Sequence, residues 1–161
     1  MTEQQLNLLS FYKGWDAYQA LLIKAVAPLS SEELALRAAP HLRSVGENVA
    51  HLISGRVSNF LVLGEAGAEM APLEQWDIPG APLRSAAELV SGLESTWQMI
   101  QTALVRWIPA DLEDVFVDGE GEQAPRFTRQ SIIWSTIKYD LHHGGEISLT
   151  LGAHHVEALD L

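Results

Sequence analysis

Apolar residues recur at alternating steps of three and four along several stretches of this chain, the spacing that places side chains on one face of an α-helix. The clearest stretch follows Ser85, which forms a capping box with Glu88, and it ends before Pro109. The residues of its apolar face are Leu89, Leu93, Trp97, Ile100, Leu104 and Trp107. The pattern therefore predicts a long amphipathic helix between Ser85 and Pro109.

The N-terminal part of the chain carries the start signals of two more helices. A capping box at Thr2 and Gln5 predicts a helix over about 2–27, which ends before a proline. Ser30 and Glu33 form a second capping box and predict a short helix that ends before the next proline. We therefore expect a long helix followed by a single short one.

A third capping box, formed by Ser44 and Glu47, predicts a second long helix over about 44–64. The apolar face expected for this helix contains Val49, Ala50, Ile53, Val57, Phe60 and Leu61. His51 lies on the polar side. The other residues of this polar stripe are Glu47, Asn48, Ser54, Gly55 and Ser58. Such a stripe either faces water or lines a cleft into which His51 points.

The last long helix is predicted over about 128–151, with Thr128 as its N-cap and Gly152 as its stop. It is apolar nearly all round: Ile133, Ile137, Leu141 and Leu151 cover one side, and Ile132, Thr136, Ile147 and Thr150 the other. A helix without a clean polar face is usually buried between partners. This helix therefore lies at the centre of the fold or also faces a second subunit.

Two connections lack a helical period. Residues 65–84 contain three prolines and predict a long loop or lid, in which Met70, Leu73, Trp76 and Ile78 are expected to pack onto the bundle rather than onto a ligand. Residues 112–127 alternate at Val115–Val117 and carry a turn signal at Asp118-Gly119, which predicts a small hairpin or an irregular segment. Four long helices with such links predict an all-α protein, a four-helix bundle forming one domain over residues 1–161.

Composition narrows the classes of partner. The net charge is -11 and the ten lysines and arginines are scattered, which argues against binding to nucleic acid or to an anionic membrane surface. No apolar run approaches the roughly 18 residues of a membrane span, and the N-terminus lacks the features of a signal peptide. The absence of cysteine excludes disulfides and thiolate ligands and fits a reducing cytosol, so we expect a cytoplasmic protein.

The side chains best suited to bind a metal or transfer a proton lie in the stretch WSTIKYDLHHGGE of the last helix. Tyr139 and His143 are four residues apart and share one face, and Glu146 follows three residues later. Metal and proton-transfer sites need groups that converge in this way. His142 points about 100° away from His143 around the helix, so we expect it to lie outside such a site.

The remaining unusual residues favour structural interpretations. His41 is expected at the surface, and His154 and His155 in a tail after the helix stop. Gly144 and Gly145 lie inside a predicted helix, where each costs roughly 1 kcal/mol relative to alanine. That cost predicts the close approach of another helix or of a second subunit.

Three pieces of the chain together resemble the DinB-like superfamily of bacterial four-helix-bundle proteins. They are WDAYQALL with PLSSEEL, then SVGENVAHLISGR, then DLHHGGEISLTLG, so the resemblance covers essentially the whole chain. It implies a divalent metal, often nickel or zinc, held by three histidines, one on the second helix and two in an H-x-x-x-H pair on the last. Carried over to this chain, these positions fall on His51, Tyr139 and His143.

Tyr139 departs from the pattern that the resemblance implies. A phenol must lose a proton with a pKa near 10 before it binds a cation well, whereas an imidazole binds in its neutral form. Either Tyr139 binds as a phenolate, or a carboxylate completes the ligand set. The carboxylate candidates are Glu47, one turn before His51, then Glu146, and more weakly Asp140.

Three functions are compatible with these residues. The first is a bundle whose divalent-metal site is incomplete or lost, serving as a small-molecule-binding or stress-associated protein. The second is a metal-dependent transferase or hydrolase, related to thiol-dependent transferases, that uses His51 and His143. The third is a structural module, and a homodimer is the expected assembly.

Overall fold

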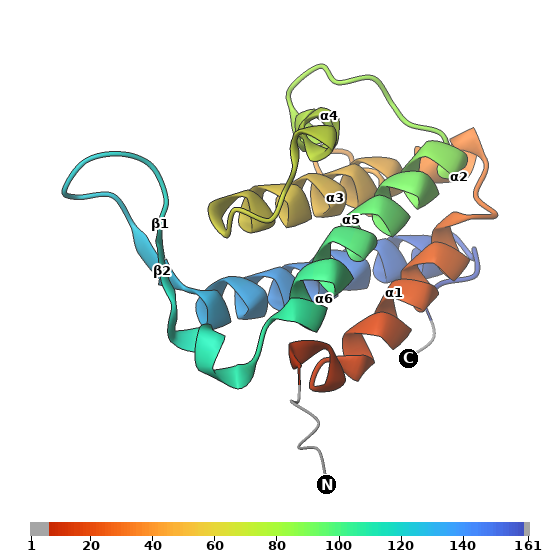
Figure 1. Cartoon of the computed structure of the whole chain (residues 1–161). Coiled ribbons are helices and arrows are strands. Elements are labelled where there is room, and N and C mark those ends of the chain that lie inside the picture. Colours follow the sequence, from red (N-terminus) through yellow and green to blue (C-terminus); the bar gives the residue numbers. More distant parts are fainter. Residues whose placement is uncertain (1–6, 160–161) are drawn as a thin grey trace, which may run out of the picture.

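The structure, a computed structural model, describes residues 7–159 and is built on four long helices (Figure 1). These helices are α1 (Lys13–Val26), α3 (Val45–Val62), α5 (Ala86–Arg106) and α6 (Arg129–Ala153), and the short α2 (Ser31–Leu34) connects α1 to α3. The all-α class and the four-helix bundle are confirmed. Within residues 7–159, no helix combines the length and the apolar character that a membrane crossing requires.

Local capping signals set most of the predicted helix starts. Both hydrogen bonds of the capping box form at Ser30, Ser44 and Ser85, and the Thr128 hydroxyl accepts from the amide of Ser131 at the start of α6. The capping box predicted at Thr2 and Gln5 lies outside the described residues.

The first long helix begins later than predicted. Residues Leu8–Ser10 form a separate 3-10 turn, and α1 starts only at Lys13 because Tyr12 adopts non-helical angles of φ -107 and ψ 30. Leu8 is fully buried, and its amide donates to the carbonyl oxygen of Trp107 over 2.9 Å. This hydrogen bond to the end of α5 holds Leu8 outside the helix, although the spacing of the apolar residues favours a helix there.

The end of α6 also differs from the prediction. The helix continues through Gly152 to Ala153 and ends because His155 adopts a left-handed conformation with φ 59. The amide of Val156 then donates to the carbonyl oxygen of Leu151 over 3.0 Å. The stop therefore lies three residues beyond the glycine expected to provide it.

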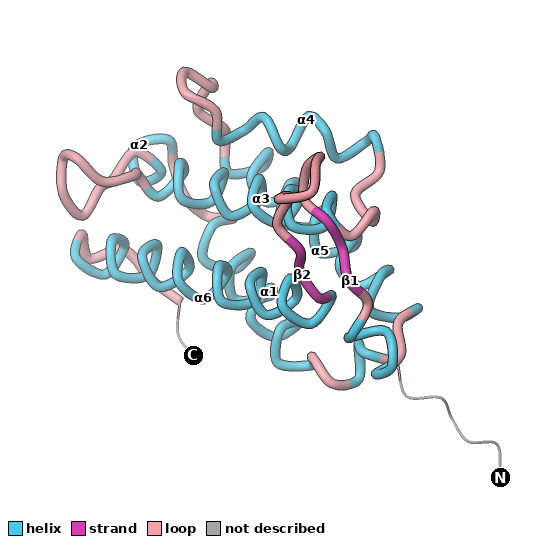
Figure 2. Tube along the Cα trace, turned by 90° about the vertical axis from the view of Figure 1, so that its left-hand side faces the viewer, coloured by secondary structure: helices cyan, strands magenta, loops and turns pink. Residues whose placement is uncertain are grey.

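The predicted loop 65–84 contains three consecutive helical turns. They are the 3-10 turn Ala68–Met70, α4 (Ala71–Glu74) and the 3-10 turn Gln75–Asp77, and we call residues 68–77 the covering segment. It lies over α3 in both views (Figures 1 and 2). Leu73, Trp76 and Met70 pack against the apolar clusters of the bundle as expected, whereas Ile78 is half exposed.

The covering segment lies on the polar stripe of α3. The Ser54 hydroxyl donates to the carbonyl oxygen of Glu74 over 2.7 Å, and the Ser58 hydroxyl donates to the Glu74 carboxylate over 3.2 Å. Asn48 and Ser54 are buried, whereas Leu61, a residue of the predicted apolar face, is half exposed. The stripe is thus an internal surface between protein segments rather than a face in water.

A two-stranded hairpin projects from one end of the bundle and faces the viewer in Figure 2. Strands β1 (Val115–Val117) and β2 (Arg126–Thr128) pair antiparallel, with Phe116 opposite Phe127. Gly119 in the connecting loop has φ +94, a conformation that side chains disfavour. The hairpin predicted in residues 112–127 is confirmed.

Each long helix contributes to both apolar clusters of the core. One cluster includes Leu22, Ile53, Leu93 and Ile147, and the other includes Trp15, Phe60, Ile100 and Ile133. By contrast, Trp134, Leu141 and Leu149 of α6 are 62%, 48% and 69% exposed. Helix α6 is therefore not buried all round within this chain.

Gly144 explains how closely α1 approaches α6. A Cβ atom at this position would lie 1.8 Å from the Tyr18 hydroxyl, so only glycine fits. At Gly145 a Cβ atom would meet nothing within 4 Å among the described residues. The predicted close helix approach is thus confirmed at the first glycine and is not found at the second.

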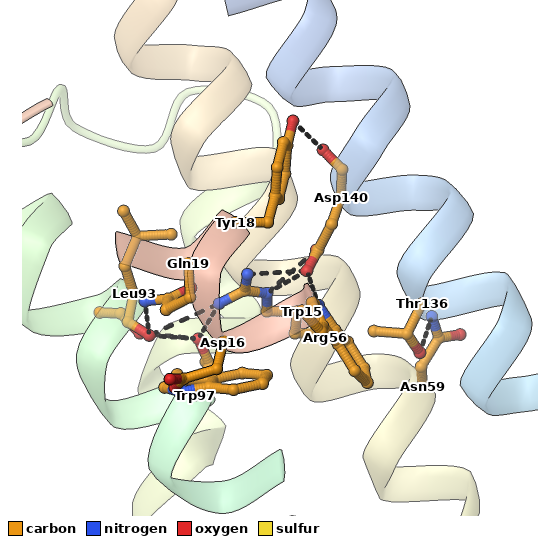
Figure 3. Close-up of polar contacts among 12 residues, drawn as sticks. Trp15, Asp16, Tyr18, Gln19, Arg56, Asn59, Leu93, Trp97, Thr136 and Asp140 are labelled. Carbon is orange, nitrogen blue, oxygen red and sulfur yellow. Dashed lines mark hydrogen bonds and ion pairs between the residues drawn. The ribbon is translucent and has the colours of Figure 1, made fainter. Parts of the chain in front are cut away.

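A buried ion pair joins α3 to α6 (Figure 3). The side chains of Arg56 and Asp140 are both 0% exposed, with Arg56 Nη2 2.7 Å from Asp140 Oδ2 and Arg56 Nε 3.0 Å from Asp140 Oδ1. Asp140 is therefore committed to an arginine, and the idea that it could serve as a metal ligand is wrong.

The remaining long helices also bond to this ion pair. From α1, Trp15 Nε1 donates to Asp140 Oδ2 over 2.6 Å, and the Tyr18 hydroxyl donates to the Asp140 carbonyl over 3.3 Å. From α5, the Thr96 hydroxyl accepts from Arg56 Nη1 over 3.3 Å. We call these five residues the closed cluster.

Candidate functional site

Three aromatic rings meet where α3 crosses α6. His51 comes from the middle of α3, and Tyr139 and His143 come from successive turns of α6. The ring centroids lie 4.9 Å apart for His51 and Tyr139, 4.5 Å for His51 and His143, and 4.4 Å for Tyr139 and His143. The structure thus brings together the three residues that sequence reasoning selected, and we call them the open cluster.

A glycine makes room for this crossing. Gly55 lies one turn after His51 on α3, and a Cβ atom there would come within 2.4 Å of Cε1 of Tyr139. Because that atom belongs to a ring held between two helices, it has little freedom to move aside. The missing side chain at Gly55 therefore allows the phenol to reach His51.

A carboxylate from the covering segment holds His51. Asp77 Oδ2 lies 2.5 Å from Nδ1 of His51, so the imidazole donates its Nδ1 proton to that carboxylate. The other nitrogen, Nε2, then accepts from the Tyr139 hydroxyl. These two partners define the tautomer of His51, with its proton on Nδ1.

His143 is held in the same way by its own helix. Glu146 Oε2 lies 2.7 Å from Nδ1 of His143, which leaves Nε2 of this ring as the acceptor. Burial lowers the pKa of His143, and the hydrogen bond with Glu146 opposes this only in part. His143 is therefore neutral at pH 7, with a lone pair on Nε2.

Tyr139 keeps its proton in the absence of a cation. Burial raises the pKa of Tyr139 to about 12, the negative charge of Asp77 adds to the effect, and the positive charge of Arg43 works against it. A phenol in this state donates a hydrogen bond and carries no charge. Only a strong nearby positive charge would favour the phenolate.

The other sequence candidates lie outside the open cluster. The Glu47 carboxylate accepts from the Ser44 amide over 2.7 Å and pairs with Arg37 over 2.7 Å, and the hydrogen bond from Arg37 lowers the pKa of Glu47. His142 is exposed, with Nε2 3.6 Å from Glu146 Oε1. Ligand atoms of His142, His143 and Glu146 all lie within 4.8 Å of one another, so the described residues also contain this surface group.

Sequence reasoning missed Asp77. The residue lies 26 positions from its partner His51, in a segment without a period. Its only sequence signal is that it is an acidic residue inside a proline-rich connection, which many surface loops share. The three surface histidines behave as expected: His41, His154 and His155 are exposed, and His154 bonds the Arg37 carbonyl over 3.0 Å.

Two cavities flank the open cluster. One, of about 540 Å³, reaches Asp77 and is lined by Trp76, Arg43 and the chain that follows the covering segment. The other, of about 180 Å³, reaches Glu146 and also borders Arg43. Neither lining includes the rings of the open cluster, so each cavity meets the site at the carboxylate that holds a histidine.

The residues of the open cluster fit a divalent metal. Two imidazoles have Nδ1 fixed by a carboxylate, the arrangement that orients metal-binding histidines and raises their basicity. Nitrogen ligands of this kind suit zinc and nickel. The Tyr139 hydroxyl lies beside them as an oxygen donor, provided that it loses its proton.

Comparisons with known proteins agree with this fold. A sequence model of the DinB superfamily matches residues 15–147. Among curated proteins, none matches the chain. The crystal structure of a DinB-like protein from Bacillus cereus ATCC 10987 is similar, with a TM-score of 0.73 and 18% identity, over 98% of this chain and 99% of that one. At that identity the likeness concerns the fold alone. Because the family match spans most of its length, the chain belongs to the DinB superfamily.

Proposed function

We propose that His51, Tyr139 and His143 bind a divalent metal ion, and that the protein is a metal-dependent transferase or hydrolase. One observation carries the proposal: both histidines have Nδ1 held by a carboxylate, so that the lone pair of each ring is on Nε2, and the two ring centroids lie 4.5 Å apart. The Tyr139 hydroxyl lies in the same space.

Each residue has a distinct task in this proposal. Asp77 and Glu146 orient the imidazoles and raise their basicity. Tyr139 releases its proton as it binds, so affinity for the metal increases with pH. When bound, the metal lowers the pKa of a coordinated water or thiol and so supplies the nucleophile.

Calorimetric titration of the purified, chelator-treated protein with zinc and with nickel tests the proposal. We expect binding tighter than roughly 10 μM, a modest threshold beside the apparent binding free energies of about 10–16 kcal/mol of structural zinc sites at pH 7. His51→Ala abolishes it, whereas Tyr139→His strengthens it by completing three imidazoles. His142→Ala is the matched control, since the surface group of His142, His143 and Glu146 would lose binding in that variant while the proposed site would keep it.

A second candidate function has its own supporting observation. The Tyr139 hydroxyl donates directly to His51 Nε2, and burial raises the pKa of Tyr139 to about 12, so the phenol occupies the donor atom that a metal needs. Asp77, His51 and Tyr139 then form a hydrogen-bonded chain in a metal-free, small-molecule-binding protein. Absence of zinc and nickel binding in the parent, with binding gained in Tyr139→His, would favour this candidate.

We also propose a homodimer formed through α6. Trp134, Leu141 and Leu149 form an exposed apolar row on this helix, and no described residue would contact a Cβ atom at Gly145 or Gly152 beside them. Small residues let a second backbone approach closely. Sedimentation velocity at micromolar concentration should show a dimer that Leu149→Glu dissociates, and a monomeric parent protein would contradict the proposal.

A further inference from the structure

Positive charge gathers in one cavity of this acidic protein. The cavity of about 540 Å³ beside Asp77 is lined by Arg37, Arg43 and Arg84, three of the ten lysines and arginines of a chain with net charge -11. Its lining contains two carboxylates, Glu47 and Asp77. The balance of formal charge inside it is therefore positive, opposite to that of the whole molecule.

Two of the three arginines are fixed in the wall. Arg37 pairs with Glu47 over 2.7 Å. Arg84 lies over the Trp76 ring, 4.8 Å from its centroid, and reaches Glu88 over 3.3 Å. Nε of Arg84 is buried and has no hydrogen-bond partner among residues 7–159, so part of the positive charge of this guanidinium is not compensated by a hydrogen bond.

Arg43 has the most open guanidinium of the three. Its nearest acidic atom, Asp77 Oδ2, is 3.7 Å away, and it makes no hydrogen bond within the described part of the chain. A guanidinium has five N–H groups in a fork that matches a carboxylate or a phosphate. Gly46 lines the same cavity in the first turn of the 18-residue helix α3, where the helix dipole favours an anion.

The rest of the cavity wall is largely apolar. Its apolar residues are Leu42, Ala50, Trp76, Ile78, Pro79, Ala81, Pro82 and Leu83. The volume falls in the range of about 300–1,000 Å³ that is typical of small-molecule pockets. A molecule that fits both parts of the wall combines one oxyanion with an apolar body.

We propose that this cavity binds a small organic molecule through its oxyanion, a carboxylate or a phosphate, with Arg43 as the main contact and the guanidinium of Arg84 as a second positive charge in the wall. Asp77 lies in the same lining and holds His51, so the bound molecule lies next to the open cluster. That this molecule is a substrate rests on the proposed function, whereas its binding does not.

Titrations followed by two-dimensional NMR of 15N-labelled full-length protein test this proposal. The probes are inorganic phosphate and benzoate, each compared with chloride at equal ionic strength. The reporter is the indole N–H signal of Trp76, identified with Trp76→Phe. We expect saturable shifts at roughly millimolar concentration, as befits such small ligands. If benzoate alone saturates the site, the cavity binds a carboxylate whose apolar body contacts the apolar wall. If phosphate alone saturates it, the cavity binds a phosphate.

Matched variants decide the outcome. Arg43→Gln should weaken binding of the effective probe by about tenfold or more, the effect of losing a charged hydrogen-bond partner. Arg126→Gln, which makes the same change of charge on the hairpin strand β2, should bind as the parent does. The proposal is overturned if neither probe shifts the Trp76 signal more than chloride does, or if both variants behave alike.

Zinc titration of Arg43→Gln separates the two proposals. We expect zinc binding to be retained in this variant, because Arg43 is not among the three proposed ligands and acts on the site only through its charge, which lowers the pKa of Tyr139. Loss of oxyanion binding with zinc binding retained supports the subsite. Oxyanion binding in a protein that binds neither zinc nor nickel supports the subsite and refutes the metal proposal.

Discussion

Two polar clusters connect α3 to α6, and they begin at adjacent residues. Asp140 belongs to the closed cluster, where it pairs with Arg56 and both side chains are 0% exposed. Tyr139 belongs to the open cluster, where its hydroxyl donates to His51, whose side chain is 17% exposed. The closed cluster contains residues from all four long helices, whereas the open cluster depends on the short covering segment and reaches two cavities only through the carboxylates that hold its histidines.

The difference separates a structural role from a functional one. In the closed cluster the carboxylate of Asp140 already accepts from Arg56 and Trp15, so it has little capacity for a further ligand. In the open cluster, Nε2 of His143 has no hydrogen-bond partner among the described residues. Unused bonding capacity beside a cavity, rather than the number of charged residues, marks the place where a ligand can bind.

The largest effect is expected from breaking the closed cluster. Asp140→Ala leaves the charge of Arg56 buried without a partner, which should lower the free energy of unfolding by about 3–5 kcal/mol. Urea denaturation at pH 7 measures it. Glu157→Ala removes an exposed partner of Lys24 and serves as the control, with almost no change expected. Equal stability of the two variants would contradict a structural role for the ion pair.

A smaller loss of stability should follow from crowding α1 against α6. Gly144→Ala places a methyl group against the Tyr18 hydroxyl, and such overpacking costs about 1–3 kcal/mol. Gly145→Ala, one residue along, meets no described atom within 4 Å and should keep or raise stability, because alanine favours helix. If thermal denaturation ranks the two variants the other way, the close approach of the helices is wrong.

The open cluster should respond in binding rather than in stability. Asp77→Asn weakens the orientation of His51, and losses of this kind reduce metal affinity by roughly 10–100-fold. Calorimetry with zinc measures the change. Glu47→Gln is the matched control, because that carboxylate is bound to Arg37 and should leave zinc affinity unaltered. If Glu47→Gln lowers the zinc affinity and Asp77→Asn does not, then Glu47, rather than Asp77, supports the metal site.

The smallest effect concerns alkaline pH. Burial raises the pKa of Tyr18 from 10.0 to about 12, with a further contribution from Asp140, so the folded chain holds this proton more tightly than the unfolded chain. The resulting stability is fully present below pH 10.0 and is lost as the pH rises through about 12. The melting temperature of Tyr18→Phe should therefore fall less steeply than that of the parent as the pH rises from 10.0 to about 12. An identical slope in both proteins would rule out this contribution.

Local signals explain which parts of the molecule could be predicted. The capping boxes at Ser30, Ser44 and Ser85 each act within four residues, so their sequence pattern and their structure coincide. The convergence of Tyr139 and His143 also follows from helical spacing alone. The resemblance to the DinB-like superfamily supplied His51 as their partner across the bundle.

Long-range contacts explain the errors. Arg56 and Asp140 are 84 residues apart and look like ordinary polar positions of two helices, so nothing local marks them as buried partners. Asp77 is brought to His51 by turns that have no periodic signal. The predicted start of the first helix is too early, because the hydrogen bond between Leu8 and Trp107 leaves no signal in the spacing of apolar residues.

The covering segment has a consequence for how occupancy of the site is reported. Asp77 is the last residue of that segment, so any ligand that prefers a correctly held His51 binds more tightly when the segment is docked. Thermodynamic reciprocity requires the same ligand to favour docking by an equal factor. The backbone amides of residues 68–77 should then exchange their hydrogens with solvent more slowly when the site is filled, which makes this short stretch a natural occupancy sensor.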